Sequence, residues 1–167
     1  MGFFEIAKNL GLLEVVDNEN KVIGFSNKDY IDKKGLRHRS IGIIITNEQI
    51  DKNHKLLISY SQGEFNLPIK DHLKIGQSYI ESAHENIKKL FSESLENKFV
   101  EIAKYKNDYK NDLENFCLFH LIYDGIIENT KNISFFWINK SDLIKDFLKY
   151  PNYSHSLKNA FRYLYQK

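Results

Sequence analysis

The distribution of apolar and polar positions along the chain predicts an alternation of strands and helices. Apolar residues at helical spacing over 3–10 predict a short amphipathic helix that ends at Gly11. The stretches Leu12–Val16 and Lys21–Phe25, separated by a polar turn, predict a hairpin. The near-continuous apolar run His38–Thr46 is typical of a strand that is buried on both faces.

The strongest helical signal lies between Ser78 and Ser94, where apolar residues recur on one face and charged residues lie off it. The other expected elements are a turn capped by Ser26, a loop over Ser61–Lys70, strands over Lys55–Tyr60, Phe99–Lys106, Phe116–Asp124 and Ile133–Ile138, a loop over Asn107–Asn115, a helix capped by Ser141 and Asp142, and a last amphipathic helix after Ser154. This order of strands, one long helix, strands and C-terminal helices predicts a mixed sheet between helices. The 167 residues are expected to form a single domain.

Composition narrows the classes of function. A hydrophobic fraction of 42% and an aromatic fraction of 14% are typical of a packed globule. The net charge of +2 gives no argument for nucleic-acid binding, and no apolar run reaches the roughly 18 residues of a membrane span. The single cysteine, Cys117, excludes an internal disulfide and a cysteine-caged zinc site, and we expect it to be a buried apolar residue. We therefore expect a cytoplasmic protein without nucleic-acid or membrane partners.

Arginine is rare in this chain, and its planar fork of donors cannot be replaced by lysine. The three arginines are Arg37, Arg39 and Arg162. Arg37 and Arg39 enter the first buried strand, where two guanidinium groups could hold a phosphate bidentately. The alternative is a surface edge on which they pair with carboxylates such as Asp29 or Asp32.

A set of short motifs in a fixed order covers nearly the whole chain. They are Leu13–Asp17, Val22-Ile23-Gly24, Gly35-Leu36-Arg37-His38-Arg39, Glu81-Ser82-Ala83, Phe136-Trp137-Ile138, Ser141-Asp142-Leu143 and Ser156-Leu157-Lys158. This set resembles the isopentenyl diphosphate isomerase-like subgroup of Nudix hydrolases. The resemblance implies an α/β Nudix-like α/β/α sandwich with a mixed sheet and a box helix over Tyr79–Glu93. It also implies hydrolysis of a diphosphate, with Mg²⁺ or Mn²⁺ neutralising the phosphates and activating water.

The catalytic box of that family is where this chain departs from the pattern. The family has Gly, five residues, Glu, seven residues, then Arg-Glu-apolar-x-Glu-Glu-x-Gly. Its defining positions fall here on Asp71, Gln77, Glu85, Asn86, Lys89, Leu90 and Ser92, and only the apolar position, Ile87, fits. Mg²⁺ requires oxygen ligands, usually carboxylates and water, so the amide, ammonium and isobutyl groups present predict no metal in the box. We expect no cofactor, and Mg²⁺ only if the chain is an active hydrolase with relocated ligands.

The isomerase interpretation is weakened in the same way. The Cys-Gly-His site of those isomerases reads Lys70-Asp71-His72 here, so only the histidine remains. Their late glutamate pair falls near Leu113–Asn115, where Glu114 is the single acid. The metal histidine upstream of His38 falls near Ile31.

Two clusters remain as candidate sites. Glu81, His84 and Glu85 share a helix face and form a weak alternative metal site, against the interpretation of an ordinary solvated face. Lys70, His72 and Lys89, with Arg37 and Arg39 from the neighbouring strand, are the predicted ligand-binding residues. They would form a metal-free basic basin for a diphosphate, unless these positions simply diverged after activity was lost.

Two functions stay open from the sequence. The first is a catalytically impaired Nudix-like protein that binds a small-molecule diphosphate, a nucleotide or a protein partner. The alternative is an active Nudix hydrolase that cleaves a nucleoside- or isoprenoid-linked diphosphate with relocated metal ligands. The N-terminal helix could mediate a dimer, although the pattern predicts no particular oligomeric state.

Overall fold

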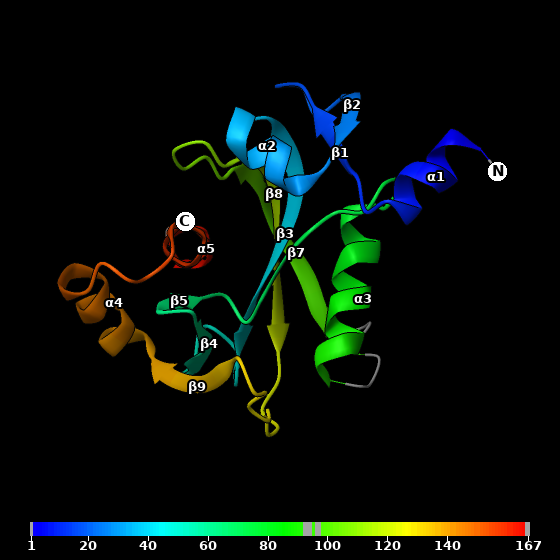
Figure 1. Cartoon of the computed structure of the whole chain (residues 1–167). Coiled ribbons are helices and arrows are strands. Elements are labelled where there is room, and N and C mark those ends of the chain that lie inside the picture. The colour runs from blue at the N-terminus through cyan, green and yellow to red at the C-terminus, as the bar shows by residue number, and fades with distance from the viewer. Residues whose placement is uncertain (1, 92–94, 96–97, 166–167) are drawn as a thin grey trace.

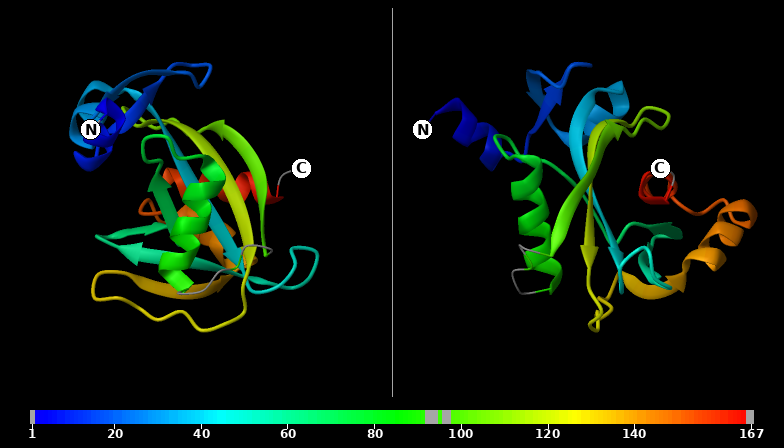
Figure 2. Two further views of the ribbon diagram at one scale, coloured as in Figure 1. Left: turned by 90° about the vertical axis from the view of Figure 1, so that its right-hand side faces the viewer. Right: turned by 180° about the vertical axis from the view of Figure 1, so that it is seen from behind.

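The chain folds into a central sheet with helices on both faces. The computed structural model describes residues 2–91, 95 and 98–165, and this part of the chain contains five helices and one nine-stranded sheet. Helix α3 covers one face of the sheet, and helices α4 and α5 cover the other (Figures 1 and 2). The predicted α/β/α sandwich with a mixed sheet is confirmed.

The N-terminal part forms the edge of the sheet. After helix α1 (Phe3–Asn9), strands β1 (Leu13–Val16) and β2 (Val22–Ser26) pair antiparallel as predicted. Helix α1 leaves Phe3 and Phe4 more than half exposed. Its role in dimer formation stays a prediction.

A full helix, α2 (Lys28–Lys34), stands where a short turn capped by Ser26 was expected. The prediction for Ser26 was wrong, because β2 continues through that residue. Asn27 caps α2 instead: its side chain accepts the backbone N–H of Tyr30 at 2.8 Å. Gly35 ends the helix in the left-handed conformation, with φ 63°.

Strand β3 (Arg37–Thr46) is the centre of the sheet. It pairs in parallel with β8 (Leu113–Ile122) over its whole length, and antiparallel with β6 (Ile69–His72) and β4 (Lys55–Ser61). Strand β8 begins before the predicted start at Phe116, because its first residues pair with the polar beginning of β3. The sheet is therefore mixed, and its middle strand contacts elements from both halves of the chain.

The predicted loop over Ser61–Lys70 was partly wrong. It contains the short strand β5 (Glu64–Asn66), which returns along β4 through a tight turn at Gln62 and Gly63, both with positive φ. It also contains the first residues of β6, which are held by pairing with β3. Strands β7 (Phe99–Lys106) and β9 (Ser134–Asn139) complete the sheet beside β8 and β4.

The helices that cover the sheet begin close to their predicted positions. Helix α3 is described over Tyr79–Phe91, and the last two residues of the predicted box helix, Ser92 and Glu93, lie outside the described residues. Helix α4 (Lys140–Lys149) begins before the predicted caps, Ser141 and Asp142, which lie in its first turn; Asn139 holds the N-cap position. Helix α5 (His155–Tyr165) starts as expected, because the Ser154 hydroxyl accepts the Leu157 N–H at 3.1 Å.

Each face of the sheet buries its own apolar core. The core under α3 includes Ala83, Ile87 and the fully buried Cys117, as the sequence predicted for that cysteine. The core under α4 and α5 includes Leu143, Leu157 and others. In the described residues, no helix is both long and apolar enough to cross a membrane.

Candidate functional site

The loop before α3 and the first turn of that helix are held by a reciprocal capping pair. The Ser78 hydroxyl accepts the Glu81 N–H at 3.2 Å, and the Glu81 carboxylate accepts the Ser78 N–H at 2.7 Å. The backbone hydrogen bond from Ser78 lowers the pKa of Glu81 below its ordinary value. Glu81 is thus used to begin the helix.

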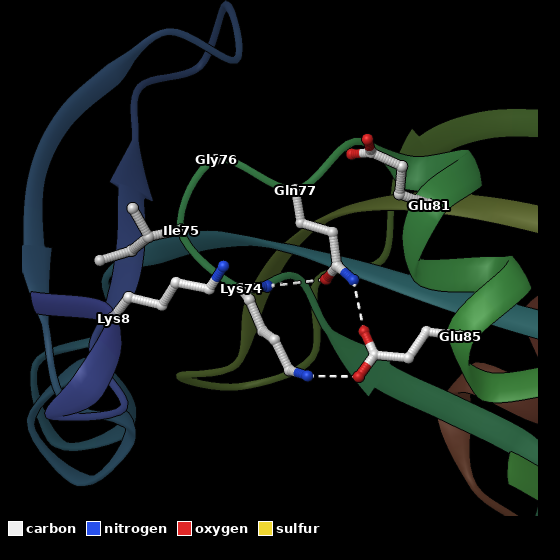
Figure 3. Close-up of a pocket in the computed structure, with 7 residues that line it drawn as sticks. All are labelled: Lys8, Lys74, Ile75, Gly76, Gln77, Glu81 and Glu85. Carbon is white, nitrogen blue, oxygen red and sulfur yellow. Dashed lines mark hydrogen bonds and ion pairs between the residues drawn. The ribbon is translucent and has the colours of Figure 1, made fainter. Parts of the chain in front are cut away.

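The position that carries arginine in the Nudix box holds Glu85 here, surrounded by donors. Its carboxylate accepts hydrogen bonds from the Lys74 ammonium and, at 2.7 Å, from the Gln77 amide (Figure 3). Lys89 also pairs with it at 3.2 Å. The hydrogen bond from Lys74, followed by those from Lys89 and Gln77, lowers the pKa of Glu85 to about 2 against the opposing effect of burial. Glu85 and Gln77 therefore belong to a local network beside a shallow pocket of about 400 Å³.

The box positions Asn86, Lys89 and Leu90 offer no carboxylate to a metal ion. Asn86 donates to the Asp71 carboxylate at 3.1 Å and to the Ser82 carbonyl at 2.9 Å. Leu90 packs against the core under α3, and Lys89 places a positive charge on the helix. These residues do not fit the oxygen-rich, octahedral site that Mg²⁺ requires.

The alternative metal group on α3 does not form in the described residues, where one other group has metal-ligand spacing. Glu81 caps the helix and Glu85 is ion-paired. The His84 ring packs edge-on against Phe99, with 4.8 Å between ring centroids. The three side chains therefore act separately.

A second polar cluster lies where β3, β6 and β8 run side by side. Strand pairing sets His38 opposite Glu114 and Ser40 opposite His72. His38 and Ser40 lie on the same face of β3, because side chains two residues apart on a strand point the same way. One ligand atom from each of His38, His72 and Glu114 lies within 4.8 Å of the others.

Glu114 is the centre of this cluster and is completely buried. Its Oε1 accepts the Ser40 hydroxyl at 2.7 Å, and Lys70 Nζ lies 3.2 Å away. Its Oε2 accepts the Asn107 amide at 2.7 Å. Burial raises the pKa of Glu114, but the charge of Lys70 and the hydrogen bonds outweigh it, and the pKa is lowered overall.

The two histidines of the cluster differ in their surroundings. Burial, followed by the charge of His38, lowers the pKa of His72 to about 4. The Nδ1 of His38 lies 3.2 Å from the Leu36 carbonyl, which can only accept, so Nδ1 carries a hydrogen. The Nε2 of the same ring is directed into the cluster, towards Asp112 and Glu114.

Among the described residues, two buried atoms of the cluster have no hydrogen-bond partner, His38 Nε2 and Asp112 Oδ1. They lie 3.6 Å apart, and His38 Nε2 lies 3.8 Å from Glu114 Oε1. Burial and the charge of Glu114 raise the pKa of Asp112. Imidazole nitrogens and a carboxylate around these two atoms form a donor set for Zn²⁺ or another transition metal rather than for Mg²⁺. A metal ion would have to displace the Lys70 ammonium from Glu114.

The two arginines predicted to bind phosphate are both engaged with the protein. Arg37 forms a two-pronged pair with Asp108, at 2.9 and 2.7 Å, so the predicted partners Asp29 and Asp32 were wrong. Arg39 donates to the Glu14 carboxylate at 2.9 Å and to the side chain and carbonyl of Asn20. Both guanidinium groups therefore tie β3 to neighbouring segments.

The predicted basic basin is brought together only in part. Lys70 and His72 meet at Glu114, as described. Lys89 lies on α3 beside Glu85, and Arg39 lies beside Glu14. Phosphate binding by these residues stays a prediction.

Sequence reasoning placed His72 in the site but did not assign His38, Asp112 or Glu114 to it. The motif containing His38 and the acids Asp112 and Glu114 were visible, but more than 70 positions separate them. Only the parallel register of β3 and β8 shows that they meet. No local pattern reports such a register.

Comparisons with known proteins agree with this geometry at the level of the fold. No family model matches the chain, and no curated protein matches it in sequence. Among solved structures, DR0079 from Deinococcus radiodurans superposes with a TM-score of 0.76 at 16% identity, covering 93% of this chain and 99% of that one. A solution structure of DR0079 describes it as a hypothetical Nudix protein.

Two further solved structures share the architecture. The NUDIX domain of Shewanella oneidensis NrtR, complexed with ADP ribose, has a TM-score of 0.58 at 8% identity, covering 77% of this chain and 86% of that one. An Ap4A hydrolase from C. elegans has a TM-score of 0.53 at 13% identity, covering 76% and 94%. The α/β/α sandwich with its central parallel pair is therefore a Nudix-like fold.

Proposed function

We propose that this chain is a Nudix-fold protein with an impaired box that binds a diphosphate-type ligand. The observation that carries the proposal is the internal pairing of the box positions. Glu85 is neutralised by Lys74 and Lys89, and Asn86 is bonded to Asp71 and Ser82. Among the described box positions on α3, Glu85 is the only carboxylate, and it is already held by two ammonium groups, so the helix lacks the group of free carboxylates that bind the metal in the family's hydrolysis.

The polar cluster at Glu114 is the proposed ligand site. Lys70 supplies an ammonium donor there, and His72 lies beside it with its side chain 27% exposed. Charge-assisted hydrogen bonds from a lysine to phosphate oxygens are stronger than neutral ones. ADP ribose, which is bound to the NrtR domain, contains a diphosphate, and this supports a nucleotide-linked diphosphate as the ligand class.

The second candidate is a hydrolase with relocated metal ligands. The metal-ligand spacing of the Glu114 cluster supports this cluster, rather than the group on α3, as the location of those ligands. His38, His72 and Glu114 would hold a divalent ion, and Ser40 and Asn107 would orient the Glu114 carboxylate. The ion would supply Lewis-acid chemistry to a nucleoside- or isoprenoid-linked diphosphate. The motifs shared with the isopentenyl diphosphate isomerase-like subgroup support the isoprenoid class.

One titration separates the two candidates. Thermal stability and turnover would be measured with ADP ribose and with isopentenyl diphosphate, first in chelator and then with Zn²⁺, Mn²⁺ or Mg²⁺. Turnover is the formation of AMP and ribose 5-phosphate from ADP ribose, and the release of phosphate from isopentenyl diphosphate. Stabilisation in chelator without turnover, lost in Lys70→Gln but kept in the control Lys88→Gln, supports the binding protein. Turnover that requires metal and disappears in Glu114→Gln supports the hydrolase. Neither stabilisation nor turnover with any ligand would contradict both.

A further inference from the structure

A pocket is lined by residues of α5 and by the last residue of β7. Helix α5 lies on the sheet face opposite α3 (Figure 1). The volume of the pocket is about 470 Å³, and it is lined by Lys106, His155, Asn159, Arg162 and Tyr163. The α5 residues follow one another at spacings of four and three, which places them on one helix face. Lys106 is the last residue of β7, an edge strand.

The side chains that line this pocket carry a net positive charge. None of the described residues that line it is acidic. Arg37 and Arg39 are ion-paired, whereas Arg162 and Lys106 form no ion pair within the described part of the chain. Burial, followed by the charge of Arg162, lowers the pKa of His155 against the opposing effects of Asp108 and Glu114, so Arg162 acts on this ring.

The wall of the pocket is held in one arrangement by the protein itself. The Asn159 amide donates to Asn107 Oδ1 at 3.0 Å and lies 2.9 Å from His155 Nε2, which accepts its other hydrogen. Tyr163 stacks on Tyr105 with 3.9 Å between ring centroids. A wall that needs no rearrangement reduces the entropic cost of binding a ligand.

We propose that this pocket binds a phosphate group, either as the free ion or as the end of a small phosphorylated molecule. The Arg162 guanidinium matches two phosphate oxygens with a planar fork, and the Lys106 ammonium supplies a second charge. The fixed, neutral His155 ring and the buried Asn159 amide form the wall against which the group rests. The site uses none of the box positions. Its wall contacts the Glu114 cluster through the bond from Asn159 to Asn107, but neither Arg162 nor Lys106 belongs to that cluster, so the proposal does not depend on the function proposed above.

The proposal is tested by calorimetry on the whole chain with inorganic phosphate, AMP and ribose 5-phosphate, at ionic strength held constant with sodium chloride. We expect saturable binding in chelator, with a dissociation constant raised at least about tenfold in Arg162→Gln and in Lys106→Gln, as the loss of a charge-assisted hydrogen bond predicts. Both residues are exposed, so the variants are expected to fold normally, which circular dichroism would check. Binding of free phosphate and of the esters with similar affinity would identify the phosphate group alone as the determinant.

One control variant makes the test specific. Lys131→Gln removes an exposed lysine from a loop outside the pocket. It should bind phosphate as the wild type does, and the NMR signals of the His155 ring should shift when phosphate binds to the wild type. The proposal is overturned if no probe binds, if Arg162→Gln binds like the wild type, or if Lys131→Gln weakens binding as strongly as Arg162→Gln.

Discussion

Gly42 lies in the middle of β3, beneath the ring of Phe116 from the neighbouring strand. A Cβ atom at this position would overlap that ring and would lie 2.7 Å from Leu67 Cδ1. Phe116 is 1% exposed and Leu67 is 2% exposed, so neither side chain has free space to move into. The absence of a side chain at Gly42 is therefore a packing requirement between the two halves of the sheet.

We expect Gly42→Ala to lower the free energy of unfolding by about 1–3 kcal/mol through overpacking. Gly24→Ala is the matched control, because Gly24 also lies in a strand and has no atom within 4 Å of the added Cβ. Its effect should stay within about 0.5 kcal/mol. Urea unfolding of both variants measures the difference, and equal losses would contradict the packing argument.

At the scale of the element, the beginning of α2 depends on one side chain. Asn27 accepts the Tyr30 N–H at 2.8 Å, whereas its neighbour Ser26 is the last residue of β2. Asn27→Ala should lower the free energy of unfolding by about 1 kcal/mol, as the loss of an N-cap does. Ser26→Ala should change it by no more than a few tenths of a kcal/mol. A larger loss of stability in Ser26→Ala than in Asn27→Ala would show that Ser26, as the sequence pattern predicted, caps the helix.

Helix α3 allows a direct test of the impaired box. Restoring the family pattern requires Gln77→Glu, Glu85→Arg, Asn86→Glu, Lys89→Glu and Leu90→Glu together. We expect Mg²⁺-dependent release of phosphate from a diphosphate, above the uncatalysed background, because carboxylates three and four apart would again face one ion. We also expect a lower melting temperature, since Leu90 packs against the core.

The control for the restored helix keeps Asn86 and carries the other four changes. It shares most of the cost in stability but lacks one carboxylate, so its activity should be much lower. If the fully restored variant is folded and inactive, the surrounding pocket has diverged together with the box.

At the scale of the whole molecule, the protonation of two histidines, His72 and His120, determines how the free energy of unfolding depends on pH. Burial, followed by the charge of His54, lowers the pKa of His120 from 6.5 to about 4, and His72 is lowered to a similar value. The unfolded chain binds these protons near pH 6.5 while the folded chain does not, so acid favours unfolding. Stability should therefore be nearly constant above pH 7 and fall as the pH drops from about 6.5 towards 4.

His120 alone should account for a loss of about 2 kcal/mol between pH 7.5 and pH 5. The measurement is urea unfolding at both pH values for the wild type and for His120→Asn, comparing the change with pH rather than the absolute stability. The variant should lose less stability by about that amount. The carboxylates with lowered pKa, such as Glu85 and Asp108, contribute only below about pH 4.5 and do not affect this window. Identical losses in the two proteins would show that His120 is protonated in the folded state.

The sequence by itself determined those features that depend on neighbours along the chain. The periodicity over Ser78–Ser94 predicted α3, the apolar run His38–Thr46 predicted β3, and the β1–β2 hairpin and α5 followed from similar local patterns. These patterns report directly which face of an element is buried. The substitutions in the box were also readable, because the family pattern is a spacing within one helix and the loop before it.

Only the tertiary structure decided which polar residues meet. Glu114 approaches His38 and His72 because β3 pairs with β8 in parallel and with β6 in antiparallel register. Arg37 pairs with Asp108 instead of Asp29 or Asp32. Asn27 caps α2 instead of Ser26, because β2 continues through Ser26. A local pattern specifies which side of a strand is apolar, but the residue opposite is fixed by the packing of the whole sheet, where a shift by one position would turn every side chain to the other face.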